Sequence, residues 1–151
     1  MKIYRITNSL YKEDLSGYGA SLYGGRWNSK GNAILYCTEH ISLAVLELVV
    51  NFNRAESPFK QSFHLVELEI VETSQIVLKL SDLKKDWIED MHYSQYIGDE
   101  FLNENSNLIL KVPSAVVPEE HNFLINPSHK DFKKIKITNS HVYKFDGRLM
   151  H

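Results

Sequence analysis

Residues 33–50 read AILYCTEHISLAVLELVV, and this stretch joins a predicted strand to a predicted helix. Residues 33–37 form a short apolar run beside a polar turn, which is typical of a buried strand. Residues 41–50 are apolar on nearly every side, which predicts a mostly buried helix that ends at Phe52. Thr38 is its possible N-cap. Cys37 is expected to be a small buried residue of the strand rather than a nucleophile.

Glu47 is the only charged residue of this predicted helix. A carboxylate inside such a helix is costly to desolvate unless it is paired or faces a cavity. On a helical wheel it lies well away from the centre of the apolar stripe, so it need not point into the core. Two interpretations follow: a glutamate on a solvent-facing strip, or a carboxylate in a pocket.

The preceding segment, residues 22–31, reads LYGGRWNSKG and is too rich in glycine for a helix or a strand. Glycine allows the backbone to approach a ligand closely. Arg26 offers a rigid fork of donors for phosphate or carboxylate, and Trp27 offers a flat face for stacking. The loop therefore favours a flat, anionic ligand such as a nucleotide. The alternative is a surface loop with an anchoring tryptophan and a solvated arginine.

The rest of the chain predicts more strands than helices. Helices are expected in two pieces between residues 81 and 105, the second over 94–104, and over 129–134, while 7–22 is expected to be an irregular loop. Strands are expected over residues 2–6, 63–70, 76–80, 107–112, 114–117, 135–138 and 142–145. Because these elements do not alternate regularly, we predict an α+β fold with a mostly antiparallel sheet core and short helices, in one compact domain over residues 1–151. No G-x-G-x-x-G motif follows a strand, so binding in the Rossmann manner is not expected.

Composition narrows the classes of function. The formal net charge of −2 provides no global field that would favour nucleic acid or an anionic membrane. No apolar run approaches the ~20 residues of a membrane span, and the N-terminus runs directly into a strand pattern without a signal peptide. With a single cysteine there is no internal disulfide. These features together predict a cytoplasmic protein.

Two other chemistries have little support in the sequence. The seven histidines form no H-x-x-x-H motif and there is only one cysteine, so no metal site is expected. Ser114 has no G-x-S-x-G context, so it is not expected to be a hydrolase nucleophile. Its better role is a hydroxyl that hydrogen-bonds the glutamate or a ribose, the alternative being an ordinary strand serine after Pro113.

Short motifs along the chain are more specific together than any one alone: Tyr4-Arg5-Ile6, the 22–31 loop, Tyr36, Glu47, Val112-Pro113-Ser114-Ala115, Pro118-Glu119, Asn122 and Asn126-Pro127. Their order and approximate spacing resemble those of the RES domain, from about residue 4 to residue 149. That family is named for an arginine, a glutamate and a serine, and it supplies the toxins of RES–Xre toxin–antitoxin pairs. The resemblance implies an ADP-ribosyltransferase-like fold and an activity that degrades NAD.

The resemblance also implies roles for individual residues. Glu47 would stabilise the positive charge that develops on the ribose as neutral nicotinamide leaves, since preorganised electrostatics are often the largest catalytic term. Arg26 would hold the pyrophosphate, Tyr36 would stack on or bond the nicotinamide side, and Ser114 would orient the glutamate. The meeting of these residues in space rests on the resemblance.

Three more residues complete the expected binding set. Arg5 is a second candidate for the phosphates or a ribose, and Trp27 contributes its flat face. Asn122 could bond the glutamate or a ribose, or merely the backbone of a nearby turn.

The predicted function is therefore a toxin that cleaves NAD at the nicotinamide–ribose bond, as a glycohydrolase or phosphorylase, and so depletes NAD and arrests bacterial growth. One alternative is a mono-ADP-ribosyltransferase that modifies a cellular protein. A second is a RES-like module that binds a nucleotide or a partner without turnover. NAD as substrate, no metal, and a cognate Xre-type helix-turn-helix antitoxin complete the expected set of ligands and partners.

Overall fold

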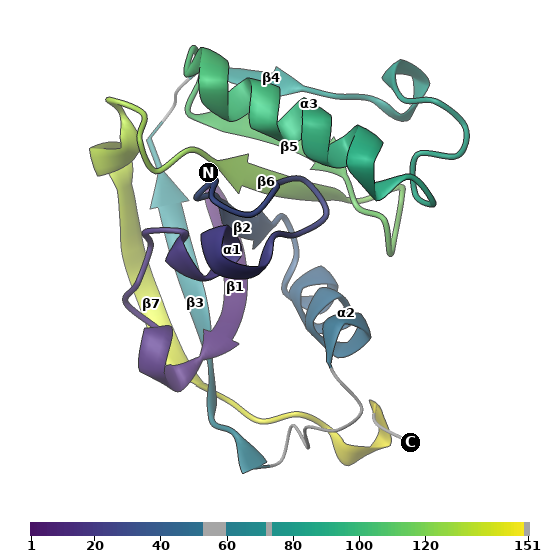
Figure 1. The fold of residues 1–151 in the computed structure, drawn as a ribbon. Helices are drawn as coiled ribbons and strands as arrows, with labels where there is room; N and C mark the ends of the chain where they lie inside the picture. Colours follow the sequence, from purple (N-terminus) through teal and green to yellow (C-terminus); the bar gives the residue numbers. More distant parts are fainter. Residues whose placement is uncertain (53–59, 72–73, 150–151) are drawn as a thin grey trace.

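A seven-stranded sheet runs through the molecule in the computed structural model, which describes residues 1–52, 60–71 and 74–149 (Figure 1). The strands lie in the order β4-β5-β6-β2-β1-β3-β7, and only the β4–β5 pair is parallel. Their bounds are β1 Lys2–Asn8, β2 Leu35–Thr38, β3 Phe63–Ile70, β4 Gln75–Val77, β5 Ile109–Pro113, β6 His121–Ile125 and β7 Ile135–Tyr143. The predicted α+β class with a mostly antiparallel sheet is confirmed.

Three α-helices surround the sheet: α1 (Tyr18–Tyr23), α2 (Ile41–Asn51) and α3 (Met91–Glu104). Helix α3 lies across β5, while α2 packs against β1 and β2 (Figure 1). Short 3-10 turns cover Ser9–Tyr11, Leu80–Asp82, Phe132–Lys134 and Gly147–Leu149. In the part of the chain that the structure describes, no helix is both long and apolar enough to cross a membrane.

The unit of β2 and α2 forms where the sequence predicts it. Leu35 and Cys37 alternate into the core, and α2 buries Leu43, Ala44 and Val45. Burial raises the pKa of Cys37 to about 12, so the thiol stays protonated and unreactive at neutral pH. The N-cap prediction is wrong. His40 occupies that position without a side-chain cap, and the Thr38 hydroxyl donates to the His40 carbonyl at 2.8 Å.

Two hydrophobic clusters make up the core. One includes Ile3, Cys37, Val66 and Ile125 from four adjacent strands. The other lies beneath α3 and contains Trp27, Ile34, Leu83, Trp87, Phe101, Leu110, Val112 and Leu124. The second cluster attaches α3 to the sheet, and it also contains the tryptophan of the 22–31 segment.

Several predicted elements differ from the observed ones. Strand β6 was not expected, although it lies between β2 and β5 inside the sheet. Residues 114–117 form a bend rather than a strand, and residues 7–22 include a 3-10 turn and most of α1. The two helical pieces expected in 81–105 are one helix, α3, preceded by turns, and β7 is continuous through residues 139–141. Of the expected 129–134 helix, only the Phe132–Lys134 turn forms.

Candidate active site

Glu47 is the centre of a hydrogen-bonded group contributed by three separate elements. The Ser114 hydroxyl donates to Glu47 Oε1 at 2.8 Å, and the Asn122 Nδ2 group donates to the same oxygen at 2.9 Å. Glu47 lies in α2, Ser114 follows the last residue of β5, and Asn122 lies in β6. The sequence-based interpretation of Glu47 as an exposed strip residue is therefore wrong, because it is half-buried and doubly hydrogen-bonded.

Strand pairing explains why the two donors reach the same oxygen. In the ladder between β5 and β6, Val112 pairs with Asn122, so Ser114 emerges from β5 beside the start of β6. Strand β6 pairs on its other side with β2, where Thr38 is opposite Asn122. Because α2 begins three residues after β2, Glu47 comes to lie over this end of the sheet.

The Ser114 hydroxyl is fixed in its direction. Its oxygen accepts hydrogen bonds from the backbone N–H groups of Val116, at 3.0 Å, and Val117, at 3.1 Å. A hydroxyl has one hydrogen and two acceptor lone pairs, so the single hydrogen is left to donate to Glu47. Ser114 is fully buried. It orients the carboxylate and is not available as a nucleophile.

Asn122 leaves one polar atom unused. Its Oδ1 is buried and accepts no hydrogen bond from the described residues, while the residue is 8% exposed. A buried acceptor without a donor costs about 1–3 kcal/mol. Both hydrogen bonds to the Glu47 side chain go to Oε1, and Oε2 accepts none from the described residues. The group thus offers acceptors for a ligand.

Tyr36 holds the 22–31 segment through its hydroxyl. The hydroxyl donates to Asn28 Oδ1 at 2.6 Å and accepts from the Trp27 backbone N–H at 3.0 Å. Burial raises the pKa of Tyr36 well above its ordinary value, with the carboxylates of Asp99 and Glu47 adding to the effect, and the Trp27 N–H and Arg26 opposing it. The phenol is therefore neutral at physiological pH.

Arg26 occupies a tight turn in this segment. The Gly25 N–H donates to the Asn28 carbonyl at 3.0 Å, so Arg26 and Trp27 are the two central residues. The Arg26 Nη1 group donates to the Ile88 carbonyl at 2.6 Å. No carboxylate of the described residues pairs with this half-buried guanidinium, so the rest of its donor fork is available to an anion.

Trp27 does not present the expected stacking face, whereas the assignment of Arg5 to the phosphates or a ribose stays a prediction. Trp27 is 0% exposed and packs against Trp87 with ring centroids 5.7 Å apart. Its flat face is therefore part of the core, and the stacking interpretation is wrong. Arg5 donates to the Asp14 carbonyl at 2.6 Å, and burial lowers its pKa while Cys37 and Asp14 raise it. The described contacts of Arg5 do not include Glu47.

A group of metal-binding residue types lies next to the site, although no metal was expected. The potential ligand atoms of Glu39, His40 and Glu120 lie within 4.8 Å of one another. Glu39 already accepts from the His121 N–H at 2.9 Å, and Lys111 lies 4.0 Å from its other oxygen. We interpret the group as an ion-pair network. Sequence spacing could not reveal it, since residues 40 and 120 are far apart in the chain.

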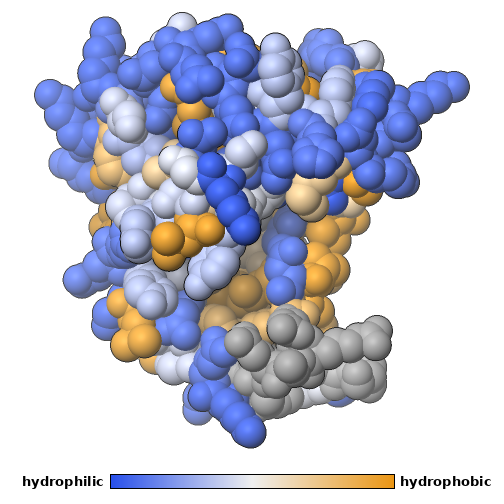
Figure 2. All heavy atoms as spheres, viewed as in Figure 1, coloured by the Kyte–Doolittle hydropathy of each residue, from blue (hydrophilic) through white to orange (hydrophobic). Residues whose placement is uncertain are grey.

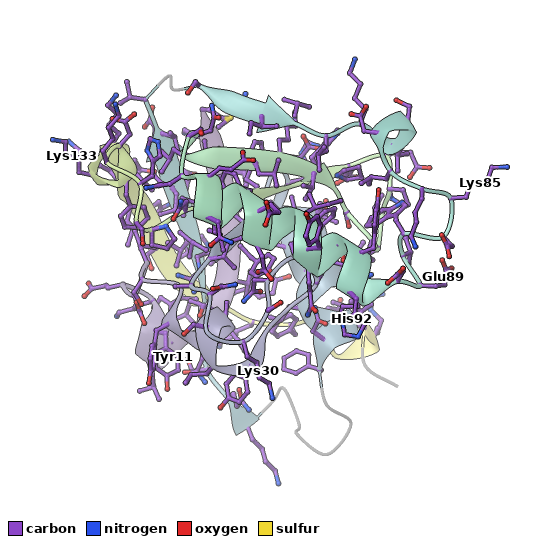
Figure 3. All side chains as sticks on the ribbon, turned by 45° about the horizontal axis from the view of Figure 1, so that its top comes forward. Tyr11, Lys30, Lys85, Glu89, His92 and Lys133 are labelled. Carbon is purple, nitrogen blue, oxygen red and sulfur yellow. The ribbon has the colours of Figure 1, made fainter. Side chains whose placement is uncertain are left out.

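On the face seen in Figure 2, the surface is hollowed beside α2, and hydrophobic atoms line the α2 side of the hollow. Lys85 and Glu89 point outward from the edge of the molecule (Figure 3). Glu47 thus belongs to the element that borders the hollow.

Comparisons with known proteins identify the family of this chain. The model of the RES domain matches residues 2–146. A protein named "Toxin Res" from Yersinia enterocolitica is 38% identical over 153 residues, covering 99% of both chains. The "Prs ADP-ribosylating toxin" of a Sphingobium species is 38% identical over 143 residues, covering 91% of this chain and 88% of its own.

A solved structure shares the fold. The M. tuberculosis MbcT–MbcA toxin–antitoxin complex contains a chain that matches with a TM-score of 0.78 and 18% identity, over 94% of this chain and 83% of that one. This match shows the fold, while the family model and the curated relatives, which cover nearly the whole chain, show the family. This protein belongs to the RES domain family.

Proposed function

We propose that this chain is the toxin of a toxin–antitoxin pair and that it cleaves NAD at the bond between nicotinamide and ribose. The observation that carries the proposal is the group of Glu47, Ser114 and Asn122. A half-buried carboxylate is held there by two donors on one oxygen, and its second oxygen accepts no hydrogen bond from the described residues. The RES family and the toxin names of the relatives support the same conclusion.

The chemistry requires a negative charge at the ribose. As the C–N bond breaks, its electron pair leaves with nicotinamide, which becomes neutral, and positive charge develops on the ribose. A carboxylate held in advance at that position stabilises the charge without having to reorganise. Ser114 and Asn122 supply this fixed orientation for Glu47.

The remaining groups fit the other parts of NAD. The unsatisfied Oδ1 of Asn122 would accept from a ribose hydroxyl or from the amide of nicotinamide, which removes the penalty of leaving it unpaired. The free part of the Arg26 fork would hold the pyrophosphate. Tyr36 fixes the turn that carries Arg26, and its ring borders the same site. Trp27 has no direct role in this binding mode.

The acceptor of the ADP-ribose defines the reaction further. Transfer to water or phosphate gives a glycohydrolase or a phosphorylase. Transfer to a protein side chain is the second candidate, and the 38% identity to a relative named as an ADP-ribosylating toxin favours it. A third possibility, binding without turnover, is disfavoured because Glu47 and both of its donors are in place.

A partner that neutralises the toxin is part of the proposal. The structural neighbour was solved as a toxin–antitoxin complex, and we propose a cognate antitoxin of the Xre-type helix-turn-helix class. Since the net charge of this chain is −2, DNA binding by the complex would come from the antitoxin.

The test compares Glu47→Gln with the parent protein. Glutamine keeps the shape and an acceptor for Ser114 and Asn122 but removes the charge, so nicotinamide release should fall about 100- to 1000-fold. Glu69→Gln, at an exposed position of β3, makes the same chemical change away from the site and should leave the rate unchanged. Thermal melting of each variant shows that the fold survives.

NAD labelled in its adenosine half distinguishes the acceptors. Label in free ADP-ribose indicates hydrolysis, label in a phosphorylated ADP-ribose indicates phosphorolysis, and label on a macromolecule indicates transfer to protein. A folded Glu47→Gln variant that releases nicotinamide at the parental rate would overturn the proposed mechanism.

A further inference from the structure

One face of α3 lies against the turn that carries Arg26. This face consists of Ser94, Gln95, Gly98 and Asp99, which share one side of the helix because they are spaced one, four and five residues apart. Each of the four contacts the segment between Gly25 and Asn32. The middle of α3 therefore supports the segment from Gly25 to Asn32.

The first half of this face holds the turn by its backbone carbonyls. The Ser94 hydroxyl donates to the Arg26 carbonyl at 2.5 Å, and the Gln95 side chain donates to the Gly25 carbonyl at 2.9 Å. Ser94 is fully buried. These two hydrogen bonds fix the backbone of Gly25 and of Arg26 at the start of the turn.

Gly98 brings the helix backbone and the turn into direct contact. A Cβ atom at this position would lie 1.7 Å from the Trp27 carbonyl oxygen and 2.7 Å from its carbonyl carbon. No other residue type leaves room for that carbonyl. The second central residue of the turn is thus pressed against the helix axis.

Asp99 accepts three hydrogen bonds from Ser29 and Asn32, which follow the turn. The Ser29 backbone N–H donates to Oδ1 at 3.0 Å, the Ser29 hydroxyl donates to Oδ2 at 2.5 Å, and the Asn32 Nδ2 group donates to Oδ1 at 2.9 Å. No Lys or Arg of the described residues forms an ion pair with this carboxylate. Its hydrogen bonds all come from Ser29 and Asn32.

We infer that Asp99 is a positioning residue for Arg26: by holding Ser29 and Asn32 against α3, it fixes the turn from which the guanidinium reaches the phosphates of the substrate. The inference rests on the proposed function for its kinetic consequence. The contacts themselves are independent of the reaction, because they join two segments of this chain. Asp99 acts through the turn and does not touch the substrate.

The test uses four variants of the full chain. Asp99→Asn keeps the size of the side chain but replaces one acceptor oxygen with a donor group, which faces the Ser29 donors. Ser29→Ala removes the hydroxyl partner while keeping Asp99, and the double variant combines both changes. Glu100→Gln makes the same chemical change at the next, exposed residue of α3 and is the matched control.

Hydrogen exchange provides the readout that does not depend on the reaction. Asp99→Asn and Ser29→Ala should each speed exchange of the amides in residues 25–32 by about tenfold or more, the size expected for losing a hydrogen bond to a charged group. Exchange in β5 and β6 should not change, and Glu100→Gln should match the parent throughout. Unchanged exchange in residues 25–32 would overturn the inference.

The kinetic readout separates positioning from simple destabilisation. A displaced Arg26 weakens binding of NAD, so KM should rise about tenfold while kcat changes little. A merely less stable protein has fewer active molecules, which lowers the apparent kcat and leaves KM unchanged. The double variant should be no worse than Asp99→Asn, because both changes break one connection.

The two proposals fail in different ways. If the parent protein releases no nicotinamide from NAD, the proposed function is wrong, and exchange in residues 25–32 alone decides whether Asp99 fixes the turn. If the parent cleaves NAD but Asp99→Asn lowers only kcat, or the double variant is additive, the positioning role is wrong. Should Asp99→Asn fail to fold, Ser29→Ala provides both measurements, since it retains the carboxylate.

Discussion

Replacing Gly98 with alanine should destabilise the protein, although alanine is the better helix residue. In an unhindered helix the change would favour folding by about 1 kcal/mol. Here the added Cβ would meet the Trp27 carbonyl oxygen at 1.7 Å, whereas non-bonded carbon and oxygen atoms approach to about 3.3 Å. The overlap is therefore about 1.6 Å, from the difference of these two distances.

Neither side of this contact can move away freely. The turn is held by the Tyr36 hydroxyl on the Trp27 N–H and by the packing of Trp27 on Trp87. The helix is held by Phe101 in the same core cluster. Overpacking of a tight site costs about 1–3 kcal/mol and occasionally more. With the overlap this large, we expect a net loss of at least about 2 kcal/mol, or roughly 4–8 °C in Tm for a chain of this size.

Thermal melting in the Glu47→Gln background measures this effect, because that change should remove toxicity and allow the protein to be produced. Gly19→Ala in α1 is the control. No atom lies within 4 Å of the Cβ it would add, so it should stabilise by about 0.5–1 kcal/mol. A Gly98→Ala variant that melts at or above its parent would refute the close approach of α3 to the turn.

Three further changes test the site. Arg26→Lys keeps the charge but loses the bidentate fork, so KM for NAD should rise about 10- to 100-fold in steady-state kinetics; an unchanged KM would place Arg26 outside the phosphate site. Ser114→Ala leaves the Val116 and Val117 N–H groups without their acceptor and Glu47 without one donor. Denaturant unfolding should show a free energy of unfolding lower by about 2 kcal/mol or more, and nicotinamide release should be slower. Burial raises the pKa of Asp99, but hydrogen bonds from Ser29 and Asn32 outweigh it and leave the pKa below its ordinary value. The ionised carboxylate therefore stabilises the fold fully above about pH 4, and this stabilisation is lost as the pH falls through the lower pKa of the folded state. Urea unfolding should then show that the free energies of unfolding of the parent and of Asp99→Asn become similar in acid and stay different at neutral and basic pH.

The local pattern of apolar residues was sufficient to predict the strands and helices that are themselves mostly apolar. The runs at 33–37 and 41–50 are apolar enough to predict β2 and α2, and they place Glu47 correctly on the helix. Strand β6 could not be found this way. It reads HNFLI, begins with two polar residues, and owes its position in the sheet to pairing with β2 and β5, which are distant in the sequence.

The site depends on the same long-range pairing. Ser114 lies 67 residues from Glu47, and Asn122 lies 75 residues from it. Spacing alone does not bring such residues together, and only the family resemblance suggested that they meet. Trp27 shows the opposite failure. A tryptophan between glycines suggested an exposed stacking face, but the indole is an anchor in the core beneath α3.

Asp99 was missed because charged residues on a helix usually indicate a solvated face. Asp99 is instead engaged by Ser29 and Asn32, whereas the neighbouring Glu100 is exposed as expected. The neighbouring Gly98 could have indicated this role, because a glycine in the interior of a helix allows another backbone to approach closely.

The two halves of the candidate site are held by different parts of the fold, and Tyr36 lies where they meet. Glu47 is fixed through β5 and β6, while Arg26 is fixed through α3. The carboxylates of Asp99 and Glu47 both raise the pKa of the Tyr36 phenol. The Tyr36 hydroxyl also anchors the turn through Trp27 and Asn28. The distance between Glu47 and Arg26, the two residues to which we assign charge stabilisation and phosphate binding, is therefore set by how α3 packs on the sheet. That packing depends on the core cluster that contains Trp27, so the residue next to Arg26 in the sequence anchors the turn in the core beneath α3.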